Sequence, residues 1–150
     1  MNTIIKAGSD LHWKKNTMHI TGHFNMDCNF KCSYCIVDTF RKTFNNQLSP
    51  TALYNLFSSL PLLKKDFYTF NISGGEPSLY TYFPQVLNYM KEFIPANKLR
   101  ATWMTNGSLL HKLEEYFKDY QEFNFNILIT LHLEQINIDT YIKKLAQFKY

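Results

Sequence analysis

The chain has 150 residues, of which 45% are hydrophobic, 17% aromatic and 19% charged, which suffices for one domain with its own core. The net charge is +4 and no run of basic residues exceeds two, which argues against a nucleic-acid-binding protein. The first 15 residues lack the apolar segment of a signal peptide, and no apolar stretch reaches the roughly 20 residues that span a bilayer. We therefore expect a cytoplasmic protein that binds neither membranes nor nucleic acids.

Residues 1–16 have the mixed composition of an irregular or short-stranded lead-in. Residues 18–24 alternate apolar and polar side chains, which predicts a strand. The three cysteines of the chain follow directly after this strand. We expect Phe30, Ile36 and Val37 to pack the cysteine loop against the core.

A helix is predicted to begin with Ser49 as its N-cap and Pro50 at its first position, and to end at Pro61. Its apolar residues fall at helical spacing: Leu53, Leu56, Phe57 and Leu60. The next strand is predicted over residues 67–73. Its apolar face carries Tyr68, Phe70 and Ile72, and its other face carries Thr69, Asn71 and Ser73.

Helices and strands continue to alternate in the second half. A helix is predicted over about 80–93, a strand over 99–105, a helix capped by Ser108, a strand over 125–132 and a last helix from near Asn137. The buried side of the first of these helices is expected to hold Phe83, Val86, Leu87, Met90 and Phe93. That of the second is expected to hold Leu109, Leu110, Leu113 and Phe117. That of the last is expected to hold Ile138, Tyr141, Ile142, Leu145 and Phe148.

Four strand–helix units in a row predict an α/β fold whose parallel strands are joined by right-handed crossovers. Polar side chains gather at the carboxyl ends of the strands, where β/α barrels carry out their chemistry. A full barrel takes roughly 250 residues, so the fold class expected here is a partial (β/α) barrel of about four units. Its open edge strand could be covered by a partner chain or by a second copy in a dimer.

The strongest chemical signal is Cys28-Asn-Phe-Lys-Cys32-Ser-Tyr-Cys35. Thiolates are soft ligands that suit iron–sulfur clusters and zinc, and three cysteines leave one iron of a four-iron cluster open. A structural Cys3His zinc site is the alternative, with His12, His19 or His23 as fourth ligand. Such sites usually contain a second pair of ligands at short spacing, which this chain lacks.

Two further loops follow predicted strands. Gly74-Gly75-Glu76-Pro77 follows the second strand, where glycines let the backbone approach a ligand closely. We expect Glu76 to place a carboxylate at the mouth of the barrel. Thr105-Asn106-Gly107 follows the third strand and is typical of a turn into a helix.

These three motifs together resemble those of the radical S-adenosylmethionine (radical SAM) enzymes, in which an aromatic residue, here Tyr34, precedes the last cysteine. Radical SAM cores usually contain six βα units, so the resemblance implies that residues 1–150 form a truncated or minimal core domain. The segments that family members carry on the fifth and sixth strands have no counterpart here. A non-catalytic module, which holds zinc or an inactive cluster, therefore stays open as the alternative.

The resemblance implies that Cys28, Cys32 and Cys35 hold a [4Fe-4S] cluster whose open iron binds SAM. An external flavodoxin- or ferredoxin-like donor would reduce the cluster. Reductive cleavage of SAM would then give a 5′-deoxyadenosyl radical, which removes a hydrogen atom from a substrate that the sequence does not identify.

The resemblance also implies a set of cofactor-binding residues. Tyr34 would lie near the adenine, the glycine loop would bind the SAM amino group, and Thr130 and His132 would face the ribose. The full set is Tyr34, Gly74, Gly75, Glu76, Pro77, Asn106, Thr130 and His132. No catalytic side chain is identified.

Overall fold

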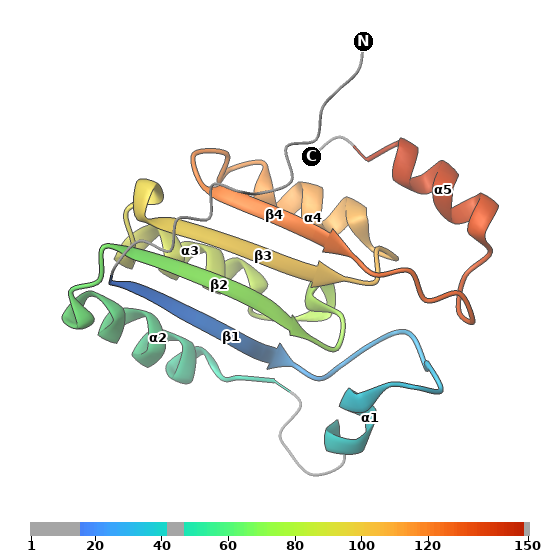
Figure 1. Ribbon diagram of the computed structural model, residues 1–150, viewed down its shortest axis with the longest axis horizontal. Helices are drawn as coiled ribbons and strands as arrows, with labels where there is room; N and C mark the ends of the chain where they lie inside the picture. The colour runs from blue at the N-terminus through green and yellow to red at the C-terminus, as the bar shows by residue number, and fades with distance from the viewer. Residues whose placement is uncertain (1–15, 42–46, 149–150) are drawn as a thin grey trace.

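A computed structural model describes residues 16–41 and 47–148 (Figure 1). The lead-in expected before residue 16, with His12, lies outside the described residues. Four parallel strands form one sheet in the order β1-β2-β3-β4. They are β1 (Thr17–Asn25), β2 (Phe67–Gly74), β3 (Leu99–Thr105) and β4 (Asn124–Ile129). The predicted parallel α/β architecture is thereby confirmed.

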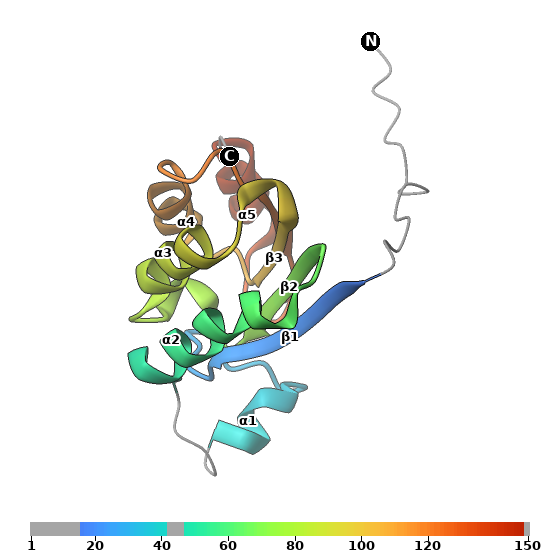
Figure 2. The same ribbon diagram turned by 90° about the vertical axis from the view of Figure 1, so that its left-hand side faces the viewer.

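Helices α1 to α4 lie between successive strands along the chain, and α5 follows β4. They are α1 (Ile36–Arg41), α2 (Pro50–Ser59), α3 (Phe83–Phe93), α4 (Leu110–Phe117) and α5 (Ile138–Ala146), with 3-10 turns at Leu60–Leu63, Pro77–Leu79 and Ala96–Lys98. Figure 2 shows α2, α3 and α4 together on one face of the sheet. Within residues 16–41 and 47–148, no helix has both the length and the apolar character needed to cross a membrane.

The core lies between this helical layer and one face of the sheet. Tyr68, Phe70 and Ile72 of β2 are buried there, as the alternating pattern predicted. Trp103 of β3 is fully buried, with its ring centroid 4.4 Å from that of Phe83. The opposite face of β2 and β3 is only half-buried, which leaves room for polar side chains on the inner side of the partial barrel.

Two predicted boundaries were wrong. The helix expected from residue 80 begins at Phe83, because the backbone first forms a 3-10 turn over Pro77–Leu79. The strand expected to reach residue 132 ends at Ile129. Its neighbour β3 ends at Thr105, whose carbonyl accepts a last hydrogen bond from Thr130, so the sheet offers no further partner.

Ser108 does not cap α4, contrary to the prediction. The N-cap is Leu109, which makes no side-chain capping bond. The backbone turns at Gly107, with φ +69°, and the Ser108 N–H donates to the Asn106 side chain at 2.9 Å. The chain is therefore still in a turn at Ser108.

The apolar residues near the cysteines and in the last helix were placed only partly correctly. Val37 is buried, but Ile36 is 72% exposed at the start of α1, a helix that the sequence did not predict. In α5, Tyr141 is buried whereas Ile138 and Ile142 are exposed. Only part of the predicted apolar stripe therefore contacts the rest of the described molecule.

Candidate functional site

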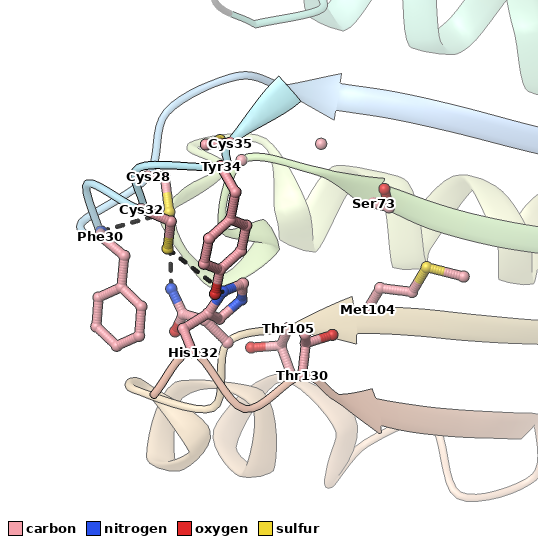
Figure 3. A pocket seen from close by; sticks show the side chains of 13 residues that line it. Cys28, Phe30, Cys32, Tyr34, Cys35, Ser73, Met104, Thr105, Thr130 and His132 are labelled. Carbon is pink, nitrogen blue, oxygen red and sulfur yellow. Dashed lines mark hydrogen bonds between the residues drawn. The ribbon is translucent and has the colours of Figure 1, made fainter. Parts of the chain in front are cut away.

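A pocket of about 200 Å³ lies at the carboxyl ends of the strands (Figure 3). Four loops meet there: the cysteine loop, the glycine loop after β2, the turn after β3 and the β4–α5 segment. The lining residues are Cys28, Phe30, Cys32, Tyr34, Cys35, Ser73, Gly74, Gly75, Met104, Thr105, Asn106, Thr130 and His132. The structure thus brings three separate sequence motifs to one place.

The three cysteines are free thiols, half-buried on the pocket wall. The Cys35 N–H donates to the Cys32 carbonyl at 3.1 Å, and α1 begins directly after Cys35. Burial raises the pKa of the Cys32 thiol above its ordinary value of 9.0, although the hydrogen bond with Tyr34 opposes this effect. A cationic metal group bound to this thiol would stabilise its thiolate form.

Within residues 16–41 and 47–148, no three His, Cys, Asp or Glu side chains converge on one metal-ion position. A tetrahedral zinc site needs its ligands around one atom, whereas a four-iron cluster takes its cysteines on separate irons. All three cysteines lie on the wall of the same pocket. Of the proposed zinc ligands, neither His19 nor His23 lines the pocket, and His19 instead contacts Thr69 at 2.6 Å.

Gly74 and Gly75 pack against the backbone that leads into the cysteine loop. Gly74 has φ +123°, and a side chain there would meet the Asn25 carbonyl. A side chain on Gly75 would meet the Asp27 carbonyl. The Gly75 N–H also donates to Asn25 at 3.0 Å. The glycines therefore permit a close approach to the chain itself, while their backbone still lines the pocket.

Glu76 is not at the mouth of the barrel, contrary to the prediction, since its exposed fraction is 0%. Its Oε1 accepts hydrogen bonds from Ser78 N–H, Ser78 Oγ and Thr105 Oγ1 at 3.1, 2.6 and 2.7 Å. Its Oε2 accepts one from Asn106 N–H at 2.8 Å. Pro77 starts the 3-10 turn, and the Glu76 carboxylate caps the N-terminus of this turn at Ser78 N–H. Neither Glu76 nor Pro77 lines the pocket; Glu76 joins the glycine loop to the end of β3.

Asn106 links the turn after β3 to the cysteine loop. Its Nδ2 donates to Asn29 Oδ1 at 3.0 Å and to Cys28 Sγ at 3.7 Å. Its carbonyl accepts a hydrogen bond from the hydroxyl of Tyr141, which occupies the space where a Gly107 side chain would lie. Helix α5 is thereby connected, through Asn106, to one of the three thiols.

Tyr34, His132 and Thr130 line the pocket on the side of β4. Tyr34 is 62% exposed and stacks on His132 with an angle of 14° between the rings. The Nδ1 atom of His132 lies 3.0 Å from the Tyr34 hydroxyl and 3.3 Å from Cys32 Sγ (Figure 3). His132, which was not among the expected zinc ligands, thus contacts a cysteine.

Four lining residues were not among the predicted site residues: Phe30, Ser73, Met104 and Thr105. The period-two pattern of β3 contained a signal for Met104, because a residue next to the buried Trp103 must face the inner side of the sheet. For Phe30 the sequence predicts only a packing role. Its ring lies edge-on to His132, at 5.8 Å between centroids.

Tyr141→Phe should lower the free energy of unfolding by about 1–2 kcal/mol, because the buried Asn106 carbonyl loses its hydrogen-bond partner. Burial, and to a smaller extent the charge of Glu76, raises the pKa of Tyr141 above its ordinary value of 10.0. The associated stability is fully present below pH 10 and is lost as the pH rises through the folded-state pKa. The variant should therefore lose less stability than the wild type above pH 10.

Urea denaturation at pH 7 and across the alkaline range measures both effects of Tyr141→Phe. Tyr89→Phe is a matched control, since Tyr89 makes ring contacts with Phe57 and Phe93 but lies outside this turn. Equal losses in the two variants at pH 7 would contradict a specific role for the Tyr141 hydroxyl.

Comparison with known families matches residues 24–149 to the family described as the radical SAM superfamily. A GTP 3′,8-cyclase of Psychromonas ingrahamii is 34% identical over 84 residues, which cover 53% of this chain and 23% of that protein. A GTP 3′,8-cyclase of Vibrio atlanticus is 28% identical over 110 residues, which cover 68% of this chain and 30% of that protein. The chain thus spans less than a third of the length of these relatives.

Solved structures share the fold. BtrN in complex with AdoMet and 2-DOIA matches with a TM-score of 0.65 at 20% identity, over 89% of this chain and 53% of that chain. SuiB of Streptococcus suis, bound to the precursor peptide SuiA, matches with a TM-score of 0.63 at 18% identity. The match covers 89% of this chain and 30% of that chain.

Proposed function

This chain belongs to the radical SAM superfamily, and we propose that it holds a [4Fe-4S] cluster and cleaves S-adenosylmethionine reductively. The observation that carries the proposal is the meeting of the cysteine loop, the glycine loop and the Asn106 turn around one pocket at the carboxyl ends of parallel strands. Residues 1–150 would form the core domain, or part of it.

In this proposal Cys28, Cys32 and Cys35 would hold the cluster, which together with SAM would supply a 5′-deoxyadenosyl radical for hydrogen abstraction from a substrate. The protein contributes orientation and exclusion of water. Asn106 orients Cys28 through its hydrogen bond to the sulfur, and hydrogen bonds of this type also tune the potential of a cluster. The buried Glu76 carboxylate holds the Asn106 backbone in place.

SAM would lie against the lining of the same pocket. The Gly74 and Gly75 backbone lines the pocket without side chains and suits the methionine part of SAM, whose amino group can donate hydrogen bonds to peptide carbonyls. Tyr34 offers an exposed aromatic face to the adenine, although the stacked pair with His132 would have to open. Thr130 and His132 are the groups for the ribose hydroxyls. Glu76 and Pro77 act through the shape of the loop.

The partners are an external flavodoxin- or ferredoxin-like electron donor and a substrate. The relatives named above are GTP 3′,8-cyclases, so GTP is the first substrate to test. The side of β4 away from β3 is unpaired in the described sheet, and Leu128 of this strand is 51% exposed. A further strand, from additional chain or from a second copy, would cover this edge.

The test is anaerobic purification and reconstitution, followed by measurement of iron, sulfide and zinc. Addition of dithionite and SAM should then give 5′-deoxyadenosine, with about four irons and four sulfides per chain. Zinc in place of iron would instead favour the structural zinc module. Iron and sulfide without 5′-deoxyadenosine would favour a cluster-binding module that does not turn over.

A further inference from the structure

The β4–α5 segment, residues 130–137, contacts the cysteine loop through two consecutive side chains. Gln135 makes a reciprocal pair with the backbone of Lys31. Its Oε1 accepts from the Lys31 N–H and its Nε2 donates to the Lys31 carbonyl, each at 3.2 Å. A side-chain amide thereby replaces the backbone partner that Lys31 would have in a sheet.

Glu134 binds Ser33 in a similar two-point manner. Its Oε1 accepts from the Ser33 N–H at 2.5 Å, and its Oε2 accepts from the Ser33 hydroxyl at 2.9 Å. Both bonds involve an ionised acceptor and are therefore stronger than neutral ones. We call the four hydrogen bonds from Glu134 and Gln135 to Lys31 and Ser33 the clasp.

The clasp encloses one cluster ligand. Lys31 and Ser33 are the two neighbours of Cys32, so the backbone on both sides of this thiol is fixed to the β4–α5 segment. The same segment carries His132, whose Nδ1 lies 3.3 Å from Cys32 Sγ. A turn holds the segment itself, since the Gln135 N–H donates to the His132 carbonyl at 2.8 Å. About 100 residues of chain separate the two loops.

We propose that Glu134 and Gln135 are positioning residues that keep the cysteine loop in its cluster-binding shape. A free loop loses conformational entropy when it takes up a cluster, and this loss weakens binding. A loop already held in shape by hydrogen bonds avoids part of that loss. Three of the four bonds reach the backbone of the cysteine loop, two at Lys31 and one at Ser33, so they act on the path of the chain. The inference rests on the proposed function, because it takes this loop as the one that holds the cluster.

The clasp itself is tested by amide hydrogen exchange on the metal-free full chain. Gln135→Ala should speed exchange of the Lys31 amide about tenfold, and Glu134→Ala should do the same for Ser33. Glu134→Gln keeps an oxygen acceptor for the Ser33 amide and should restore most of the protection. Glu92→Ala and Gln121→Ala are the matched controls, since both side chains are exposed and neither lines the pocket.

The positioning role is tested on reconstituted protein by the rate of iron release to a chelator. The double variant Glu134→Ala/Gln135→Ala should release iron about tenfold faster than the wild type, with unchanged far-ultraviolet circular dichroism. Unchanged exchange at both amides would overturn the clasp. Faster exchange with an unchanged rate of iron release would overturn the positioning role. A wild-type chain that takes up no iron would overturn the proposed function and the positioning role with it, whereas the exchange results would still stand.

Discussion

Glu76→Ala should lower the free energy of unfolding by roughly 3–5 kcal/mol, because it leaves buried hydrogen-bond donors without an acceptor. The carboxylate accepts hydrogen bonds from two backbone amides, those of Ser78 and Asn106, and from two hydroxyls. The hydroxyls can rotate to other acceptors, but the amides cannot. A loss of this size is a large fraction of the 5–15 kcal/mol that stabilises a typical domain.

Urea unfolding of the metal-free protein measures this loss directly. Glu76→Gln should cost less than Glu76→Ala, since one amide oxygen still accepts, but its NH2 group would face the Asn106 N–H. Glu92→Ala, on the exposed face of α3, is a control for removal of one carboxylate and should change stability by less than about 0.5 kcal/mol. A Glu76→Ala protein as stable as this control would show that the carboxylate does not organise the turn.

Replacement of any one cysteine, Cys28, Cys32 or Cys35, by alanine should abolish retention of the cluster. Three thiolates leave one iron open already, so the loss of one more ligand leaves two irons without protein ligands. Iron should fall from about four per chain to below one, and formation of 5′-deoxyadenosine should fall below detection. Iron and sulfide analysis of anaerobically reconstituted variants measures the effect.

The cysteine variants need a check that they still fold. The thiols are only half-buried, so the free energy of unfolding of each metal-free variant should differ by less than about 1 kcal/mol from that of the metal-free wild type. Retention of a full complement of iron and sulfide by any of the three variants would contradict the ligand set. Loss of zinc rather than of iron would identify a zinc site instead.

The fold could be predicted largely from the sequence because its signals are local. Alternation of apolar residues in 67–73 and 99–105 requires a strand with one buried face, and the structure has both strands there. Ser49 followed by Pro50 marks a helix start, and the Ser49 hydroxyl indeed accepts a hydrogen bond from the Ala52 N–H. No local signal marks the end of the fourth strand, since that end depends on where β3 stops.

The sequence by itself determined the alternation of strands and helices, and with it the parallel strands. It also identified the three motifs whose loops meet at one edge of the sheet. It could not place Glu76 in the core, and it contained no local sign of the clasp or of the contact between Tyr141 and Asn106. Periodicity and turn chemistry describe neighbours within a few residues. These hydrogen bonds join residues 30, 35 and more than 100 positions apart. They form only when the folded sheet brings the loops together, so only the tertiary structure decided them.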